Sequence, residues 1–327
     1  MRSPKVRSHL KTEAEQARDR AKIRIAFRPE RISAHATPET FEMLMNVKSG
    51  VYTRIDPTAA AAPVLFETPR SGGKYPHDFR TIALLKDLQR SISMYVEECY
   101  LDVVDSGATW LFAEFPNIYI DLNRNELDID PSQLTGKWPV ALQPGPKTKT
   151  GIGLIPTVCA GTKPVYDAPL SVTEVANRID NYYWPYHNEV TRLLKKFKAE
   201  HGGAYHLSCH SMPALPSPSA PDAGQHRSDF DLGDRNGQTS GKDLLELATE
   251  VLRGFGYRVT HNAHFIGAEA VRKHGNPAEN IHSLQIEMNR SLYMNEATSL
   301  RSENLPEVGQ HLKTLAARIA DHARAKG

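Results

Sequence analysis

Short apolar runs alternate with long amphipathic segments along this chain, and this alternation most constrains its fold. We predict the runs as strands and the amphipathic segments as helices that cover them. Strands are expected at residues 64–66, 110–112, 118–120, 204–207, 229–232, 257–260 and 283–290, and helices at 81–104 in two pieces, 171–198, 242–253 and 305–325. The pattern predicts a three-layer α/β fold, with a mostly parallel or mixed sheet and helices on both faces.

Length and composition indicate a soluble globular protein. The chain has 327 residues, of which 40% are hydrophobic and 24% are charged. These fractions are typical of globular proteins rather than disordered ones. We divide the chain into a charged N-terminal extension and linker, residues 1–50, and a catalytic domain, residues 51–327. A solvated helix is expected within the extension, from Thr12 to Ile25.

Charge and cysteine content exclude several classes of function. A net charge of +2 is too mild to indicate a nucleic-acid partner. The sequence has no apolar run of about 18 residues, the length that a membrane helix requires. No apolar stretch follows the basic start, so a cytoplasmic location is expected. Cys99, Cys159 and Cys209 lack C-x-x-C spacing, which argues against both a disulfide framework and a zinc knuckle.

Polar residues gather where the predicted strands end. His210 follows the run 204–207 in a Ser-rich, Pro-terminated stretch, and we expect a partly exposed imidazole in a turn, suited to a metal ligand or a general base. In α/β sheets, ligands bind at the carboxyl ends of the strands. Further side chains lie at or just beyond predicted strands and are expected to share that rim, namely Arg70, Asn123, Arg124 and Glu287.

Five stretches add a family resemblance to this picture. They are 69–72 with 75–76, 121–124, 209–213, 233–237 and 285–294. In this order and at this spacing they resemble the N-formylglutamate amidohydrolase (N-formylglutamate deformylase) family, which is related in fold to the zinc carboxypeptidases. The resemblance covers the chain from Val51 to Ala297. It implies a zinc-carboxypeptidase-like sheet.

The resemblance also implies a metal-dependent hydrolase that cleaves the amide bond of a small acidic N-acyl amino acid, typified by N-formyl-L-glutamate, which gives L-glutamate and formate. A zinc ion would activate the attacking water. His210 and Glu98 match zinc ligands, and Glu287 matches the general base. Substrate-side and catalytic roles are implied for a larger set, namely Asn123, Arg124, Arg178, His187, Asn262 and Arg290.

Two departures from the family pattern bear on the metal. The first loop reads Pro-His-Ser-Gly in the family, whereas Arg70 stands at the histidine position here, and a guanidinium cannot ligate zinc. Ser208 stands where an aspartate is frequent. His77 could supply the missing nitrogen, or His210 and carboxylates could bind metal weakly. Alternatively, the site has lost its metal and Arg70 binds anions, which predicts an acidic-ligand binding protein or a poor hydrolase.

A thiol hydrolase with Cys209 as nucleophile is a further hypothesis. Cys209 is adjacent to His210, and adjacent residues of a strand point to opposite faces. The two side chains are therefore poorly placed to form a nucleophile–base pair.

Overall fold

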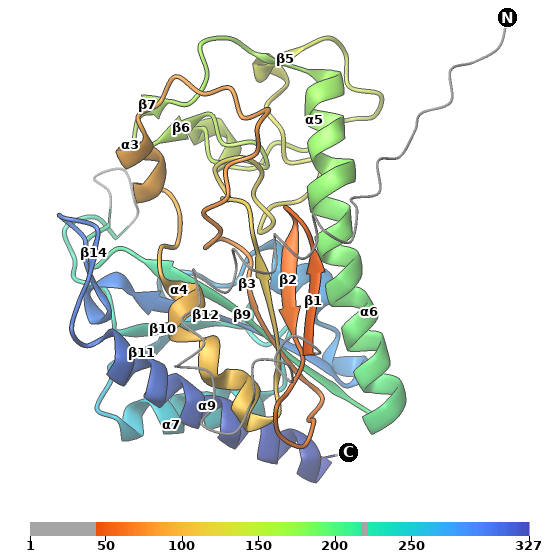
Figure 1. Ribbon diagram of the computed structural model, residues 1–327, viewed down its shortest axis with the longest axis vertical. Coiled ribbons are helices and arrows are strands. Elements are labelled where there is room, and N and C mark those ends of the chain that lie inside the picture. Colours follow the sequence, from red (N-terminus) through yellow and green to blue (C-terminus); the bar gives the residue numbers. More distant parts are fainter. Residues whose placement is uncertain (1–43, 217–221, 327) are drawn as a thin grey trace, which may run out of the picture. The chain divides into compact units, whose positions relative to one another are not determined.

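The centre of the computed structural model, which describes residues 44–216 and 222–326, is an eight-stranded sheet (Figure 1). From edge to edge its strands are β1 (Met45–Lys48), β2 (Tyr52–Ile55), β4 (Thr109–Ala113), β3 (Val64–Thr68), β9 (Ala204–Met212), β12 (Ile281–Asn289), β10 (Phe230–Gly233) and β11 (Val259–His261). Neighbours among β4, β3, β9 and β12 pair in parallel. The carboxyl ends of these four strands therefore meet at one edge of the sheet, where ligands bind in α/β folds.

The outer strands make the sheet mixed. Strand β2 is antiparallel to β4 and to β1, and β10 is antiparallel to β12 but parallel to β11. Three small two-stranded ribbons lie outside the main sheet: β5 (Leu134–Thr135) with β8 (Leu170–Ser171), β6 (Val158–Cys159) with β7 (Lys163–Pro164), and β13 (Met294–Asn295) with β14 (Leu300–Arg301).

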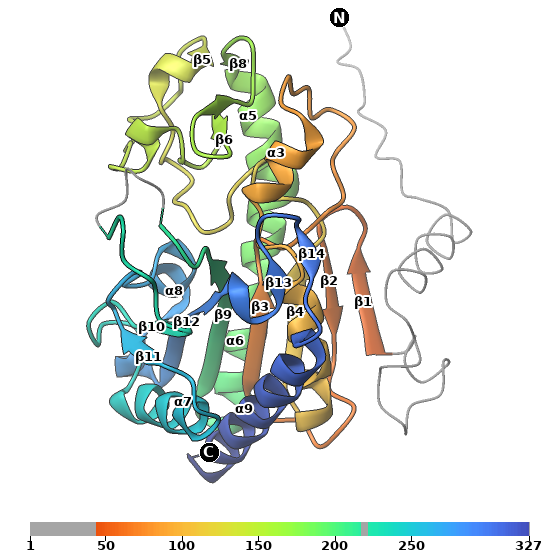
Figure 2. The ribbon, with the colours of Figure 1, turned by 90° about the vertical axis from the view of Figure 1, so that its left-hand side faces the viewer.

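Helices cover both faces of the sheet (Figure 2). Helices α6 (Trp184–His201) and α8 (Glu269–His274) pack on one face, and α7 (Lys242–Gly254) and α9 (Leu305–Lys326) pack on the other. Of the short helices, α4 (Val96–Cys99) packs against α9 and β9, whereas α3 (Leu85–Arg90) contacts β6 and α5 (Val172–Arg178) contacts β8. The predicted α/β architecture is confirmed. Among the described residues, no helix is long and apolar enough to cross a membrane.

The helix predicted at 171–198 is a capped helix with one irregular turn. The Ser171 hydroxyl accepts a hydrogen bond from the Glu174 backbone N–H at 3.1 Å, as its capping sequence predicts. A π-helical turn, Ile179–Tyr183, joins α5 to α6. Gly202 then ends α6 in the left-handed conformation at φ 76°, which glycine adopts without steric cost.

Several predicted elements differ in the structure. Residues 118–120, predicted as a strand, form a buried turn. The helix predicted within 81–104 is three short pieces, α3, α4 and the 3-10 helix Leu101–Ser106. Residues 45–55, which carry no strong strand pattern, form β1 and β2 because they pair at the open edge of β4. The helix predicted at 12–25 lies outside the described residues, and the division at residue 50 stays a prediction.

The prediction for His210 was wrong in its local structure. Strand β9 does not stop at Leu207 but runs to Met212, and all of its residues pair with β12. His210 therefore lies inside a strand, and its side chain is buried rather than partly exposed. Pro213, which lacks a backbone donor, comes just after the strand and marks its true end.

Candidate active site

Buried polar side chains recur at alternate positions along the three central strands, so they share one face of the sheet. They are Glu67 on β3, His206, Ser208 and His210 on β9, and Ser283, Gln285 and Glu287 on β12, and we call this set the polar face. In the register of the sheet, Ser208 lies between Glu67 and Gln285. His210 lies directly beside Glu287. The strand period of two thus converts an alternating sequence into a continuous polar surface within the fold.

A loop beyond β4 brings Asn123 onto the polar face. Its side-chain Nδ2 donates to Gln285 Oε1 at 3.2 Å and lies 3.3 Å from His210 Nε2. Its Oδ1 accepts a hydrogen bond from the backbone N–H of Ala270, in α8, at 2.8 Å. Two hydrogen bonds, to Gln285 of β12 and from Ala270 of α8, therefore orient the amide beside His210.

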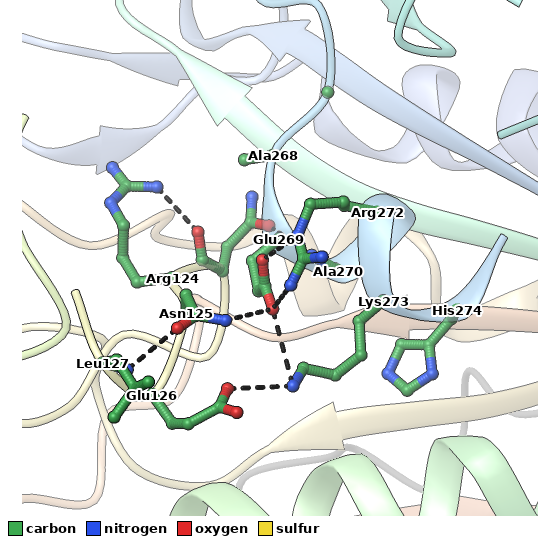
Figure 3. Close-up of polar contacts among 12 residues, drawn as sticks. Arg124, Asn125, Glu126, Leu127, Ala268, Glu269, Ala270, Arg272, Lys273 and His274 are labelled. Carbon is green, nitrogen blue, oxygen red and sulfur yellow. Dashed lines mark hydrogen bonds and ion pairs between the residues drawn. The ribbon is translucent and has the colours of Figure 1, made fainter. Parts of the chain in front are cut away.

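Helix α8 also clasps the same loop through charged side chains (Figure 3). Buried Glu269 accepts a hydrogen bond from Asn125 at 3.2 Å and forms ion pairs with Arg272 and Lys273. Lys273 reaches on to Glu126, 3.0 Å away. The clasp ties the loop that carries Asn123 and Arg124 to the helix whose N–H holds Asn123.

Three cationic side chains surround the carboxylates at this end of the sheet. The Arg70 guanidinium lies 3.3 Å from Asp121 Oδ2, and that of Arg124 lies 4.0 Å from the same oxygen. Burial alone would raise the pKa of Asp121, but these two guanidiniums outweigh it and hold the pKa below its usual value. Loss of hydration, then the charges of Arg124 and Arg70, lowers the pKa of the Lys147 ammonium to about 8.

Glu287 is a carboxyl group with the properties of a general base. Burial, together with the negative charge of Asp231, raises its pKa to about 7, against the opposing charges of Arg70 and Lys147. Gln285 Nε2 donates to its Oε1 at 2.9 Å, which fixes its orientation. A carboxyl that titrates near neutral pH can accept and return a proton within one catalytic cycle.

His210 is a neutral imidazole at this site. Burial and the nearby Arg70 charge lower its pKa to about 3. Its Nε2 lies 2.9 Å from Ser208 Oγ, and its Nδ1 is buried without a hydrogen-bond partner. An orphaned polar atom of this kind indicates either an absent ligand or a functional role.

Sequence prediction and structure agree on the core of the site. Five predicted side chains belong to this constellation, namely Arg70, Asn123, Arg124, His210 and Glu287. Their individual roles stay predictions. The common rim was expected because each lies at or beyond a predicted strand.

Four residues predicted on the substrate side are held in structural contacts. The buried Arg178 guanidinium donates to the Tyr119 carbonyl at 2.9 Å and stacks over the Tyr119 ring. His187 lies 3.0 Å from the Leu122 carbonyl. The others brace turns: Asn262 Nδ2 donates to Asp234 at 2.8 Å, and Arg290 donates to Ser211 Oγ at 3.2 Å and to the carbonyls of Arg90 and Ile92.

Two predicted metal ligands lie apart from the constellation. Glu98, in α4, forms an ion pair with Arg301 of β14. His77 is exposed.

The donor set does not fit a zinc ion. A protein zinc site usually takes three or more His, Cys, Asp or Glu ligands. In residues 44–216 and 222–326, no three such side chains are grouped so that they could hold a metal. Arg70 instead stands against Asp121, where its permanent charge would repel a cation. Zinc thus stays a prediction from the resemblance, and the chemistry below uses the chain's own groups.

Some contributors to the site were missed in the sequence. Lys147 lies within residues 136–156, a stretch rich in Pro, Gly and Lys, where no pattern marks one lysine among several. Glu67 follows the predicted strand 64–66 and was interpreted as part of the loop after it, whereas it belongs to β3. His206 and His274 carry no motif. Strand alternation through His206, Ser208 and His210 was the signal that could have found the polar face.

Comparison with known proteins defines the class of this site. The chain is 28% identical over 244 residues to a Pseudomonas putida N-formylglutamate deformylase, covering 72% of the chain and 82% of that protein. The crystal structure of an N-formylglutamate amidohydrolase from Ralstonia eutropha JMP134 matches with a TM-score of 0.80 and 38% identity, over 85% of this chain and all of that one. An Agrobacterium tumefaciens protein shares the fold at 18% identity and a TM-score of 0.56. The first of these relatives and the Ralstonia eutropha structure define the protein as an amidohydrolase.

The family follows from a longer match. Residues 62–294 fit the family model described as N-formylglutamate amidohydrolase. The match spans more than half of the chain and includes every side chain of the constellation. The chain belongs to the N-formylglutamate amidohydrolase family, as the five stretches predicted.

Proposed function

We propose that the protein hydrolyses the amide bond of a small acidic N-acyl amino acid, and that N-formyl-L-glutamate is the first substrate to test. The observation that carries this proposal is Glu287, a buried carboxyl whose pKa is raised to about 7, beside the cations Arg70 and Lys147. A base of this kind next to fixed positive charge suits amide hydrolysis of an anionic substrate. The names of the relatives supply the substrate class.

The cations account for recognition of an acidic substrate. Lys147 and Nη2 of Arg124 would bind substrate carboxylates, whereas Nε and Nη1 of Arg124 donate to the backbone carbonyls of Ile152 and Asn123 and so hold the guanidinium in place. Burial, and then the charges of Arg124 and Arg70, lowers the pKa of Lys147, and a bound carboxylate would relieve the repulsion among these cations. Arg70 would bind the carbonyl oxygen, on which negative charge develops.

Glu287 would move the proton in this reaction. Its carboxylate takes a proton from water as the water oxygen bonds to the acyl carbon and the carbonyl electrons move to oxygen. The protonated Glu287 then donates to the amide nitrogen as the C–N bond breaks. The products are the free amino acid and the carboxylic acid, formate in the case of a formyl group.

The experiment is a substrate panel on purified protein with zinc content measured in the same sample. N-formyl-L-glutamate, N-acetyl-L-glutamate and N-formyl-L-alanine separate the acyl group from the side-chain carboxylate. Turnover of N-formyl-L-glutamate that requires Glu287 supports the proposal, and absence of hydrolysis across the panel would reject it.

A binding protein without turnover is the second candidate, and Arg70 favours it, because a guanidinium that cannot ligate zinc stands at the histidine position of the first loop. It predicts calorimetric binding of N-formyl-L-glutamate with no product formed. Arg70→His tests directly whether the site can bind zinc. If the site is a weakened zinc centre, this variant raises both zinc occupancy and rate, and no change in either contradicts that account.

A further inference from the structure

A hydrogen-bonded chain runs from β3 through β9 to the free nitrogen of His210. Ser208 Oγ lies 2.7 Å from Glu67 Oε1 on one side and 2.9 Å from His210 Nε2 on the other. All three side chains are fully buried. The spacing follows from the sheet register, in which Glu67 and Ser208 are partners and His210 is two residues further along β9.

Glu67 is the charged end of this chain. Burial opposes its ionisation, but His206 and the Ser208 hydroxyl outweigh burial and lower the pKa of Glu67 to about 2. His206 Nε2 lies 3.2 Å from the same carboxylate oxygen. An ionised carboxylate only accepts hydrogen bonds, so the Ser208 hydroxyl hydrogen points to Glu67.

The number of available hydrogens then determines the tautomer of the His210 imidazole. Ser208 has a single hydroxyl hydrogen, and once this is given to Glu67, its oxygen offers only lone pairs to His210. The 2.9 Å contact is then a hydrogen bond only if His210 Nε2 carries the hydrogen. In the neutral ring, Nδ1 is left with its lone pair and no hydrogen.

The competing tautomer would gain one weak contact and carry two costs. It would let Asn123 donate to a bare Nε2 at 3.3 Å, the longer of the two contacts. It would also put two lone pairs together at the 2.9 Å contact with Ser208. In addition, it would bury an N–H at Nδ1, where the structure provides no acceptor, and a buried donor without a partner is costly.

We propose that Glu67 and Ser208 are positioning residues that hold His210 in the Nε2–H tautomer, so that Nδ1 is an acceptor for a donor group of the bound molecule. This inference rests on the proposed function only for the identity of the bound molecule. Arg70, Arg124 and Lys147 are cationic donors, whereas neutral Nδ1 can accept from an amide N–H or a water.

The direct test is ¹⁵N NMR of the full chain with labelled histidine. Nitrogen shifts separate bare from protonated ring positions, and the missing signals in His210→Gln assign the residue. We expect a protonated Nε2 and a bare Nδ1 in the wild type. Ser208→Ala and Glu67→Gln should shift His210 toward the other tautomer, whereas Ser208→Thr, which keeps the hydroxyl, should retain the wild-type pattern.

The matched control is Cys209→Ala, a buried neighbour on the same strand whose side chain points to the opposite face. It should leave the His210 tautomer unchanged. A wild-type spectrum with bare Nε2, or an unchanged tautomer in Ser208→Ala, would overturn the proposal. Since the NMR result does not depend on turnover, it remains decisive even if the substrate panel shows no hydrolysis.

Kinetics provide the second readout. In an active enzyme, Ser208→Ala should lower kcat by about 10- to 100-fold, the range for residues that orient a functional group, with a smaller change in KM. Ser208→Thr should restore most of the rate. If Ser208→Ala lowers the melting temperature but leaves kcat and the His210 tautomer unchanged, then Ser208 has only a structural role.

Discussion

At the scale of single residues, Arg70 sets the electrostatics of the whole site. Its guanidinium lowers the pKa of Asp121, opposes the rise in the pKa of Glu287 and lowers the pKa of His210. Burial is the larger influence on all three pKa values, and the permanent charge of Arg70 favours the ionised form of the two carboxylates and the neutral form of the imidazole. This is the combination that binding an anion beside a base requires.

Removal of the Arg70 charge should weaken both binding and rate. In Arg70→Gln we expect kcat/KM for N-formyl-L-glutamate to fall by about 100-fold, which corresponds to roughly 2.7 kcal/mol of lost transition-state stabilisation. Arg70→Lys, which retains the charge without the planar fork, should lose less. Arg318→Gln, which breaks an exposed ion pair with Glu250, is the control. Equal rates in Arg70→Gln and the control would contradict the role given to Arg70.

Glu287 makes both activity and stability depend on pH. Its pKa is about 7 in the folded protein against an ordinary 4.5, so the folded state binds the proton more tightly between these values. Its stabilising contribution is therefore full below pH 4.5 and is lost as pH rises through about 7. Activity should rise over the same upper range, because the base must be ionised.

Glu287→Gln should separate these two effects. We expect hydrolysis to be lost while urea denaturation above pH 7 shows a more stable protein, by on the order of 3 kcal/mol, with the gain vanishing below pH 4.5. Exposed Glu246→Gln should show neither change. If Glu287→Gln is less stable than the wild type at pH 8, the Glu287 carboxylate is not an uncompensated buried charge.

At the scale of elements, helix α8 supports the loop of residues 121–128, which carries Asn123 and Arg124. Glu269 joins Asn125 of the loop to Arg272 and Lys273 of the helix, and the Ala270 N–H orients Asn123 (Figure 3). Backbone hydrogen bonds also hold this loop, from the Arg124 N–H to the Asp121 carbonyl at 3.1 Å and from the Asp128 N–H to the Asn125 carbonyl at 2.9 Å. Helix α8, from a distant part of the sequence, adds the contacts that fix the Asn123 and Asn125 side chains.

Glu269→Gln should loosen this clasp. We expect a loss of about 1–3 kcal/mol in urea denaturation and faster amide hydrogen exchange confined to residues 121–128, because a buried charge network is broken. KM should rise as Asn123 and Arg124 lose their fixed positions. The control is Glu279→Gln, which removes an exposed ion pair with Lys198. Uniform exchange across the sheet in Glu269→Gln would point to global destabilisation instead.

Sequence patterns predicted elements better where local periodicity is strong. Strand β12 and helices α7 and α9 were predicted within a few residues because apolar positions recur at the period of each element. Strand β9 was cut short because Ser208, His210 and Ser211 read as a turn. Their polarity is accommodated by partners on β3, β12 and the 121–124 loop, which no local pattern reveals.

At the scale of the whole molecule, the two faces of the sheet differ: one carries the polar side chains of the candidate site, and the other packs through apolar side chains. The polar face meets α6 and α8, whereas the opposite face meets α9 and the segment around Tyr100, which packs on Phe66. Glu67 and Phe66 are adjacent on β3 and point to opposite faces. The fold was predictable from alternating elements, but the chemistry depends on which polar residues share a face, and that follows only from register.

The separation of faces predicts that core packing under α9 can be weakened without altering the site. Leu315 is fully buried in α9, and Leu315→Ala should cost about 2–5 kcal/mol through lost burial and the cavity left behind. At a temperature where the variant remains folded, its kcat and KM should equal those of the wild type. Urea denaturation and steady-state kinetics on the same sample check both halves. A change in KM without a change in stability would mean that α9 and the polar face are coupled through the sheet, because the two faces share the backbone of β3 and β9.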